Sequence, residues 1–369
     1  MSLQDEIIEK SSKIYRDSYQ MSIGELINLY RDGEMDIHPE FQRVFRWSDA
    51  QKTRLIESIM LNIPIPSIFV SQNDEGIWDI IDGVQRLSTI FQFVGVFKND
   101  DNVIVDPLKL LATDYLPSFD GMLWNNSDDE SKSFTKEQQL AFKRSRIDVI
   151  IVRKESDPNT KYELFQRLNT GGTRLSDQEV RNCLMIMTNR EFYHFILELS
   201  DNEDFKNCVN ITSRKEDEQF RLELVLRLLI AQYMNFDSIR SYSDLKDLLD
   251  KETINLINQL DKNLYSSIKS NFDRTFNLLY NTLGEDSFKK YIDDKHKGPF
   301  LVSAFQCIAS GIFYNLDDVE AFEPNRIIKI IRSIYTDAEY LSNIESGVQA
   351  VPRFKELTLL GRKLFGNED

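Results

Sequence analysis

Five consecutive residues, Asp82-Gly83-Val84-Gln85-Arg86, have types and spacing that suit anion binding. An apolar, strand-like segment at 77–81 precedes them. Apolar residues then recur at helical spacing after them, at Leu87, Ile90, Phe91 and Val94. The run therefore falls where a buried strand passes into an amphipathic helix. The start of a helix offers free N–H groups and the positive end of the helix dipole, which together hold anions.

The side chains of this run suit phosphate chemistry in particular. Gly83 lets backbone approach a ligand closely, and Arg86 can hold a phosphate through two parallel hydrogen bonds. Asp82 can hold a magnesium ion or orient water, and Gln85 can position a water molecule. An ordinary strand–turn–helix with Asp82 as N-cap and a solvent-facing Arg86 explains the same five residues. Taken alone, the run favours this ordinary interpretation over a phosphate site.

Two further segments carry residues of the same chemical kind. Phe41-Gln42-Arg43, followed by Arg46 and Trp47, places arginines beside aromatic rings, which suits phosphate or base contact. Asn169-Thr170-Gly171-Gly172 follows a predicted helix and can expose N–H groups to an oxyanion. The alternatives are a surface loop anchored by its aromatic side chains and a glycine-terminated helix end.

The elements that must position these residues differ between the two halves of the chain. Capping-box patterns at Ser22 and Ser48 predict two helices, and strands are predicted over 68–70, 77–81 and 147–152. A helix is predicted over 135–146, and another begins at Ser176. After about Cys183 the strand signals nearly vanish, and apolar residues recur three and four apart. We therefore predict an α+β fold, with a mixed α/β domain over 1–182 and a helical bundle over 183–369.

The composition of the chain argues against several classes of function. The net charge of the 369 residues is −15, which argues against broad coating of nucleic acid. No apolar stretch approaches the roughly 18 residues of a membrane span, and the first ten residues do not resemble a signal peptide. The three cysteines are widely spaced, so reduced thiols in a cytoplasmic protein are expected. The common nucleotide and metal motifs, such as the P-loop and the EF-hand, are absent from the sequence.

The segments together, in this order, resemble a known bacterial family. F-Q-R…W, N-I-P-I-P, I-D-G-V-Q-R-L and F-Q-R-L-N-T-G-G-T-R-L-S-D-Q-E-V-R-N span roughly Ser22 to Asn182. They resemble domain-of-unknown-function family 262, the N-terminal domain of GmrSD-type restriction systems. That family is similar in fold to the ParB and sulfiredoxin superfamily. The resemblance therefore implies a ParB/sulfiredoxin-like N-terminal domain followed by an all-helical region.

The resemblance also implies an activity and a set of site residues. Members bind and often hydrolyse nucleoside triphosphates at a D-G-Q-Q-R motif, in modification-dependent restriction of phage. Carried over, the implied catalytic residues are Asp82, Gln85 and Arg86, and Asp82 is the implied Mg²⁺ ligand. The implied nucleotide-binding residues are Arg43, Gly83, Arg86, Asn169, Gly171 and Gly172. Val84 departs from the motif, which usually has Gln there, so nucleotide binding is expected more firmly than turnover.

The resemblance also implies partners, because the nuclease half of such restriction systems is usually an HNH-type domain. An HNH-type nuclease needs a histidine base and metal ligands, and this chain has only His38, His194 and His296. Residues 294–299 weakly resemble the start of such a domain, and we interpret them as a loop before a helix at Phe300. The resemblance therefore implies an NTP-binding and NTP-hydrolysing sensor subunit, using GTP, ATP or another NTP, without a nuclease of its own. Its partners would be modified DNA and a separate HNH-type nuclease subunit, without a membrane; a homo-oligomer is compatible with the sequence.

Two other functions stay open at this point. The first is a DNA- or protein-binding adaptor with a decayed NTPase site, which Val84 and the acidic charge favour. The second is a ParB-like metal-dependent nuclease, in which carboxylates such as Asp79 and Asp82 would bind the metal.

Overall fold

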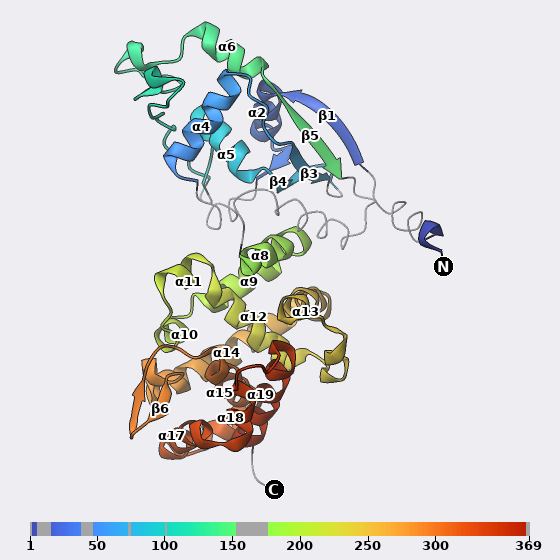
Figure 1. Cartoon of the computed structure of the whole chain (residues 1–369), viewed down its shortest axis with the longest axis vertical. Coiled ribbons are helices and arrows are strands. Elements are labelled where there is room, and N and C mark those ends of the chain that lie inside the picture. The colour runs from blue at the N-terminus through green and yellow to red at the C-terminus, as the bar shows by residue number, and fades with distance from the viewer. Residues whose placement is uncertain are drawn as a thin grey trace. The chain divides into compact units, whose positions relative to one another are not determined.

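A computed structural model of the chain describes residues 2–5, 16–37, 47–72, 75–99, 102–152 and 176–366. The chain divides into two compact units, residues 1–174 and 175–369 (Figure 1). The first unit is mixed α/β and the second is helical, as the sequence predicts. The predicted domain boundary, between Asn182 and Cys183, falls inside helix α8 (Asp177–Thr188), which belongs to the second unit.

A five-stranded sheet of order β1-β5-β3-β4-β2 forms the centre of the first unit. β1 is antiparallel to β5, β5 is parallel to β3, β3 is antiparallel to β4, and β4 is parallel to β2. The strands are β1 (Arg16–Ser22), β2 (Met35–Asp36), β3 (Ile68–Gln72), β4 (Trp78–Asp82) and β5 (Arg146–Val152). The predicted strands at β3, β4 and β5 are confirmed.

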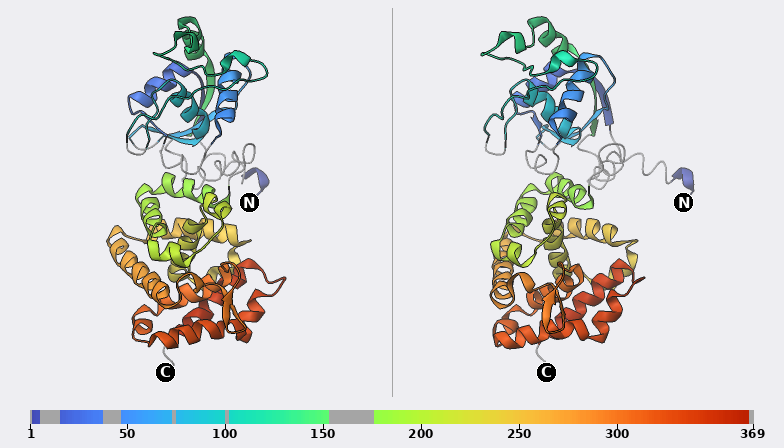
Figure 2. Two further views of the ribbon diagram at one scale, coloured as in Figure 1. Left: turned by 90° about the vertical axis from the view of Figure 1, so that its left-hand side faces the viewer. Right: turned by 60° about the vertical axis from the view of Figure 1, so that its left-hand side comes forward.

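The helices of the first unit gather on one side of this sheet (Figures 1 and 2). The alternation of buried and exposed side chains along β5 explains this arrangement. Ile147, Val149 and Ile151 are buried, while Arg146 and Asp148 are exposed. The helices are α2 (Ile23–Arg31), α4 (Asp49–Met60), α5 (Val84–Phe93) and α6 (Lys136–Arg144), with short 3-10 turns at Pro117–Phe119 and Glu130–Lys132. The predicted caps are confirmed, because the hydroxyls of Ser22 and Ser48 accept hydrogen bonds from the N–H groups of Glu25 and Gln51.

An aromatic cluster anchors the far end of α5. Phe93, near the end of the helix, meets Trp124, Phe134 and Phe142 edge-to-face, at ring-centroid distances of 5.5, 5.0 and 5.6 Å. Such pairs add about 0.5–1.5 kcal/mol each beyond the area that they bury. The irregular segment 102–135 therefore anchors α5, whose first three residues belong to the Asp82–Arg86 run.

The second unit is built from helices packed around α12, which is buried on most of its surface. The closest approach is between α15 and α19, where a Cβ on Gly361 would lie 1.9 Å from the carbonyl oxygen of Cys307. Only glycine fits there. The helices are α8, α9 (Arg190–Ser200), α10 (Glu203–Cys208), α11 (Ser213–Asp217), α12 (Phe220–Tyr233), α13 (Leu245–Gln259), α14 (Tyr265–Thr282), α15 (Val302–Tyr314), α16 (Leu316–Glu320), α17 (Pro324–Ser333), α18 (Ala338–Ile344) and α19 (Ala350–Phe365).

One part of the second unit differs from the predicted loop at 294–299. Strands β6 (Lys290–Ile292) and β7 (Lys295–Lys297) form a hairpin there, and the next helix begins at Val302 rather than at Phe300. Its turn residues, Asp293 and Asp294, have φ of +50° and +58°. Two consecutive positive φ angles give the turn a twist that matches paired strands. The weak resemblance to an HNH domain therefore falls on a structural hairpin.

All three cysteines are free and buried, as expected for thiols packed as small apolar side chains. Burial raises the pKa of the Cys208 thiol to about 12, so this sulfur stays protonated at neutral pH. Among the helices that the structure describes, none is both long and apolar enough to cross a bilayer.

Candidate functional site

The junction between β4 and α5 is shaped by Gly83. This residue is the N-cap of α5 and has φ +106°, a conformation that other residues rarely adopt. A Cβ there would lie 2.4 Å from Cδ1 of the buried Ile68. The alternative in which Asp82 is the N-cap is wrong. Among the described residues no side chain caps α5, so the first-turn N–H groups are left to other acceptors.

A β-bulge lies directly before this junction. Phe69 of β3 pairs with Asp82 of β4, but Val70 pairs with Ile80, so β4 carries one extra residue. A bulge bends its strand and changes the direction of the side chains that follow it. The bulge therefore sets the direction of Asp82 at the carboxyl end of β4.

Asp82 and Arg86 form an ion pair across the junction. Nη2 of Arg86 lies 2.7 Å from Oδ2 of Asp82, and the side chains of Arg86 and Asp82 are 10% and 30% exposed. The solvent-facing Arg86 of the alternative interpretation is therefore also wrong. Arg86 is a largely buried cation whose partner carboxylate remains accessible.

Gln85 connects this junction to a second predicted segment. Its Oε1 accepts a hydrogen bond from the backbone N–H of Trp47, at 3.2 Å. Trp47 is the last residue of the F-Q-R…W segment, so the structure brings the end of that segment to the site. Four of the predicted site residues lie outside the described residues: Arg43, Asn169, Gly171 and Gly172. Their place in the site stays a prediction.

Two hydroxyls next to the site were not predicted from the sequence. Ser88 and Thr89 are 9% and 1% exposed, and within the described part of the chain neither hydroxyl has a hydrogen-bond partner. Buried helical hydroxyls usually bond to the carbonyl four residues earlier. The sequence spacing could have indicated these two hydroxyls. Ser88 lies three residues after Gln85, and Thr89 three after Arg86, so the two residues of each pair share a helix face.

Asp82 is the residue at this junction that could hold a magnesium ion. Mg²⁺ keeps several waters and is usually bound by one or two carboxylates together with substrate phosphates. Asp82 supplies one such accessible carboxylate. Over the residues that the structure describes, no group of three or more His, Cys, Asp or Glu side chains is placed to hold a metal.

The end of the third predicted segment has a structural role. Arg181, in α8, is 1% exposed. Its Nε lies 2.8 Å from Oδ1 of Asp250, its Nη1 lies 3.3 Å from Oε2 of Glu223, and it also donates to Gln178. Burial disfavours the charged form of Glu223, but the charges of Arg227 and Arg181 outweigh it and hold the pKa of this carboxyl below its usual value. Arg181 therefore ties α8 to α12 and α13.

Gly83→Ala is expected to destabilise the first unit by about 2 kcal/mol, because the left-handed conformation costs about 1–2 kcal/mol and the new Cβ meets Ile68. The measurement is chemical denaturation followed by tryptophan fluorescence, since all three tryptophans, Trp47, Trp78 and Trp124, lie in this unit. Gly33→Ala is the matched control, because Gly33 has φ +76° and no atom within 4 Å of its added Cβ. Equal losses in both variants would contradict the close contact at Gly83.

Comparison with known proteins places this junction in a family. Residues 23–186 match the model of the family described as "GmrSD restriction endonuclease, N-terminal domain". This segment is a GmrSD-type N-terminal domain. The chain is also similar to the solved structure of a Pnob8-like ParB-N domain, with 14% identity, a TM-score of 0.26, and coverage of 91% of this chain and 99% of that chain. No curated protein matches the sequence.

The GmrSD-type domain contains the whole of the site described above. It covers β3, β4 and α5, and it ends within α8, beyond Arg181. The match points to a component of a restriction system, which agrees with the resemblance seen in the sequence.

Proposed function

We propose that this chain binds a nucleoside triphosphate at the start of α5 and hydrolyses it, as the sensor subunit of a bacterial modification-dependent restriction system directed against phage. The observation that carries the proposal is the Asp82–Arg86 ion pair at a helix start that no described side chain caps. The negative charge of a phosphate chain would match Arg86, and the positive charge of its Mg²⁺ would match Asp82. The GmrSD-type domain supports the same class of system.

Binding would exchange the internal ion pair for two pairs with the ligand. The guanidinium of Arg86 would turn from Asp82 to a phosphate oxygen, and the carboxylate of Asp82 would be released to the magnesium ion. The first-turn N–H groups of α5 would donate to the same phosphates. Because Arg86 is largely buried, its charge is weakly screened and acts strongly on a phosphate.

Turnover would use the neighbouring polar groups. A bound magnesium ion would neutralise charge on the phosphoryl oxygens, and Gln85 would be the residue to orient the attacking water. Val84 occupies the position at which the family usually has Gln, and it is 7% exposed. Its apolar side chain cannot hold a water molecule, so slow hydrolysis is part of the proposal.

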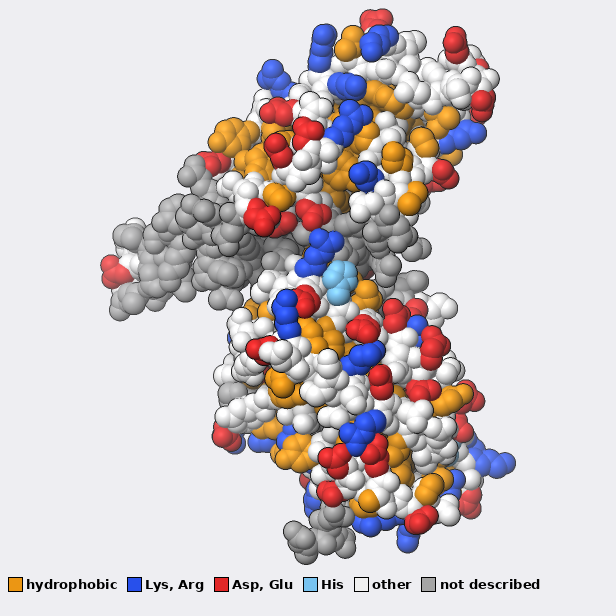
Figure 3. Space-filling view, turned by 180° about the vertical axis from the view of Figure 1, so that it is seen from behind, with side chains coloured by type: hydrophobic (Ala, Val, Ile, Leu, Met, Phe, Trp, Pro, Cys, Tyr) orange, Lys and Arg blue, Asp and Glu red, His pale blue; other side chains and the backbone are white. Residues whose placement is uncertain are grey.

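The proposed partners are modified DNA and a nuclease subunit in a separate polypeptide. Contact with DNA requires positive charge on one face, because the whole chain is acidic. Figure 3 shows Lys and Arg side chains gathered toward the α6 end of the first unit. Exposed cations on and next to α6 include Lys136, Lys143, Arg144 and Arg146. This end of the unit is the surface that we propose for DNA.

An NTP with Mg²⁺ is expected to raise the melting temperature of the chain. A ligand present at about 100 times its Kd adds about 2.7 kcal/mol of stability, which corresponds to a shift of several degrees. Arg86→Ala should abolish the shift, whatever its effect on the ligand-free protein. Arg54→Ala, at an exposed position of α4, should leave the shift intact. If no NTP produces a shift in the unmodified protein, the proposal is wrong.

The decayed adaptor is the second candidate, and the burial of Val84 is the observation that favours it. An adaptor would bind NTP or DNA without releasing phosphate. The two candidates are separated by assaying phosphate release with a panel of NTPs, with and without modified DNA. Release that disappears in Asp82→Ala would exclude the adaptor.

A further inference from the structure

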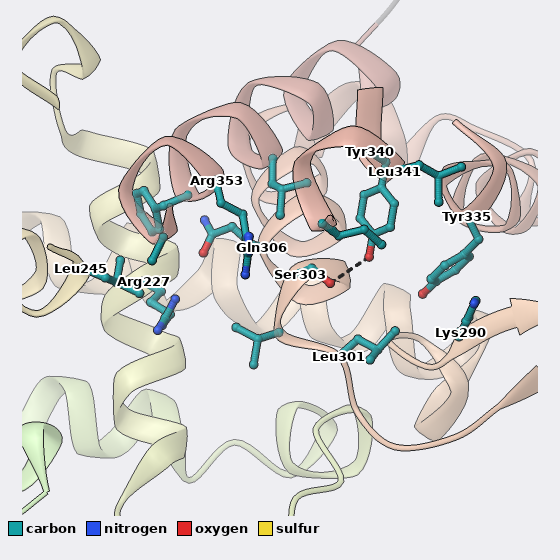
Figure 4. Close-up of a pocket in the computed structure, with 15 residues that line it drawn as sticks. Arg227, Leu245, Lys290, Leu301, Ser303, Gln306, Tyr335, Tyr340, Leu341 and Arg353 are labelled. Carbon is teal, nitrogen blue, oxygen red and sulfur yellow. Dashed lines mark hydrogen bonds between the residues drawn. The ribbon is translucent and has the colours of Figure 1, made fainter. Parts of the chain in front are cut away.

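A pocket of about 540 Å³ lies wholly within the second unit, and none of its lining residues belongs to the D-G-V-Q-R run. It is bordered by α12, α15, α18, α19 and strand β6 (Figure 4). Pockets of about 300–1,000 Å³ are typical of small-molecule sites, which combine apolar walls with a few placed polar groups. The pocket is therefore large enough for a ligand of the size of a nucleotide.

Two buried polar groups in its lining have unused hydrogen-bonding capacity. The amide nitrogen of Gln306, a residue 3% exposed, donates to Thr358 at 2.8 Å and to Ser310 at 3.3 Å. Its Oε1 and the hydroxyl of Tyr335, a residue 6% exposed, have no hydrogen-bond partner in the described part of the chain. Each such group costs free energy unless a ligand or water satisfies it. Burial raises the pKa of Tyr335 far above its usual value, so this hydroxyl remains a hydrogen-bond donor at neutral pH.

The charged residues described in the lining are all basic. Arg353 donates to the backbone carbonyls of Asn343 and Val348, at 3.1 and 2.9 Å, and among the described residues no carboxylate pairs with it. Lys290 likewise has no carboxylate partner among the described residues. Arg227, in contrast, does pair with a carboxylate, because its Nη2 lies 2.7 Å from Oε1 of Glu223. None of the residues described as lining the pocket is acidic, so an anion is favoured inside.

The apolar part of the lining lies between these groups. In Figure 4, Arg227, Gln306 and Arg353 are drawn on one side of the pocket, and Tyr335 and Lys290 on the other. Leu301, Phe354 and Leu357 supply apolar walls, and the exposed Leu341 and Ile344 supply an apolar rim. The arrangement suits an elongated ligand with one anionic end, an apolar or planar middle and a polar far end.

We propose that this pocket binds a free nucleoside monophosphate. The phosphate would lie toward Arg353 and Arg227, the sugar and base along the apolar walls, and the polar edge of the base toward Tyr335 and Lys290. Gln306 Oε1 would accept a hydrogen bond from the ligand. The site is separate from the NTP site proposed at α5, and it would make the helical unit a second point of nucleotide control.

The test is calorimetric titration of the full chain with the four 2′-deoxynucleoside 5′-monophosphates and, separately, with inorganic phosphate. At least one monophosphate is expected to bind at least tenfold more tightly than inorganic phosphate. Arg353→Gln should weaken that binding at least tenfold. Ala350→Trp is the second variant, because Ala350 is exposed at the pocket and a large side chain there would block it without removing a core contact.

Two control variants distinguish binding in this pocket from binding elsewhere on the chain. Lys295→Gln, on the paired strand of the same hairpin, removes a positive charge outside the pocket and should leave the affinity unchanged. Arg86→Ala changes the proposed NTP site and should also leave the affinity for the monophosphate unchanged. A failure of the NTP proposal at α5 can therefore be told apart from a failure of the proposal for this pocket. The proposal is overturned if no monophosphate binds, if inorganic phosphate binds equally well, or if folded Arg353→Gln and Ala350→Trp bind like the unmodified protein.

Discussion

Asp82→Asn is expected to lower NTP hydrolysis by this chain by at least about 100-fold. Removing one group that stabilises transition-state charge commonly costs a factor of about 10² to 10³. An amide has nearly the same shape as the carboxylate, but it provides no negative charge for Mg²⁺. Phosphate release, measured with the NTP that binds best, reports the effect directly.

The same substitution also removes the partner of Arg86, so activity and folding must be measured together. Arg86 is largely buried, and its unpaired charge would lower stability. Tryptophan fluorescence during denaturation would show whether the first unit is still folded at the assay temperature. Asp148→Asn is a matched control, since it makes the same chemical change at an exposed position of β5. Hydrolysis at the unmodified rate by a folded Asp82→Asn variant would exclude Asp82 from catalysis.

Arg181→Met is expected to destabilise the second unit by about 3–5 kcal/mol. The substitution leaves Asp250 and Glu223, whose side chains are 7% and 13% exposed, without one of their cationic partners. Breaking a buried ion pair by removing one member typically costs this much, because the remaining charge stays in a medium of low dielectric constant. Denaturation followed by circular dichroism at helical wavelengths reports on this unit, which contains no tryptophan.

The comparison for Arg181 is an arginine in an exposed pair of the same unit. Arg214 lies 2.9 Å from Glu218, but its side chain is 88% exposed, so Arg214→Met should change stability by less than about 1 kcal/mol. The double variant Arg181→Met/Asp250→Leu should recover part of the loss, because it also removes a buried carboxylate that has lost the Arg181 charge. If Arg181→Met and Arg214→Met lose equal stability, the buried network does not stabilise the unit.

Features that depend on neighbours in the chain were predictable. The helix starts at Ser22, Ser48 and Ser176 follow from hydroxyl and carboxamide or carboxylate side chains three residues apart, a local pattern that the structure retains. The passage from strand to helix at Gly83 follows from a change of apolar period. The family was recognisable for the same reason, since its motifs are short runs of residues.

Features that depend on distant partners were not predicted. Strand β1 is polar, with Ser18, Tyr19 and Gln20 exposed, and it is a strand because β5 pairs with it along its whole length. The hairpin at 290–297 was interpreted as a loop because each strand has only three residues and little apolar pattern. In both cases the stabilising hydrogen bonds come from another strand, which a local pattern does not contain.

The candidate site shows the same division. Residue types and their order singled out Asp82, Gln85 and Arg86, and the helix start that contains them, as a candidate anion-binding site. Only the tertiary structure decided that Arg86 is buried and paired with Asp82, that Gln85 meets the backbone of Trp47, and that Ser88 and Thr89 lie beside them. Likewise, Arg181 became a structural anchor and the helical unit acquired a basic pocket only through folding. The chemistry of a side chain is present in the sequence, but burial, pairing and the shape of a cavity arise from residues far apart along the chain.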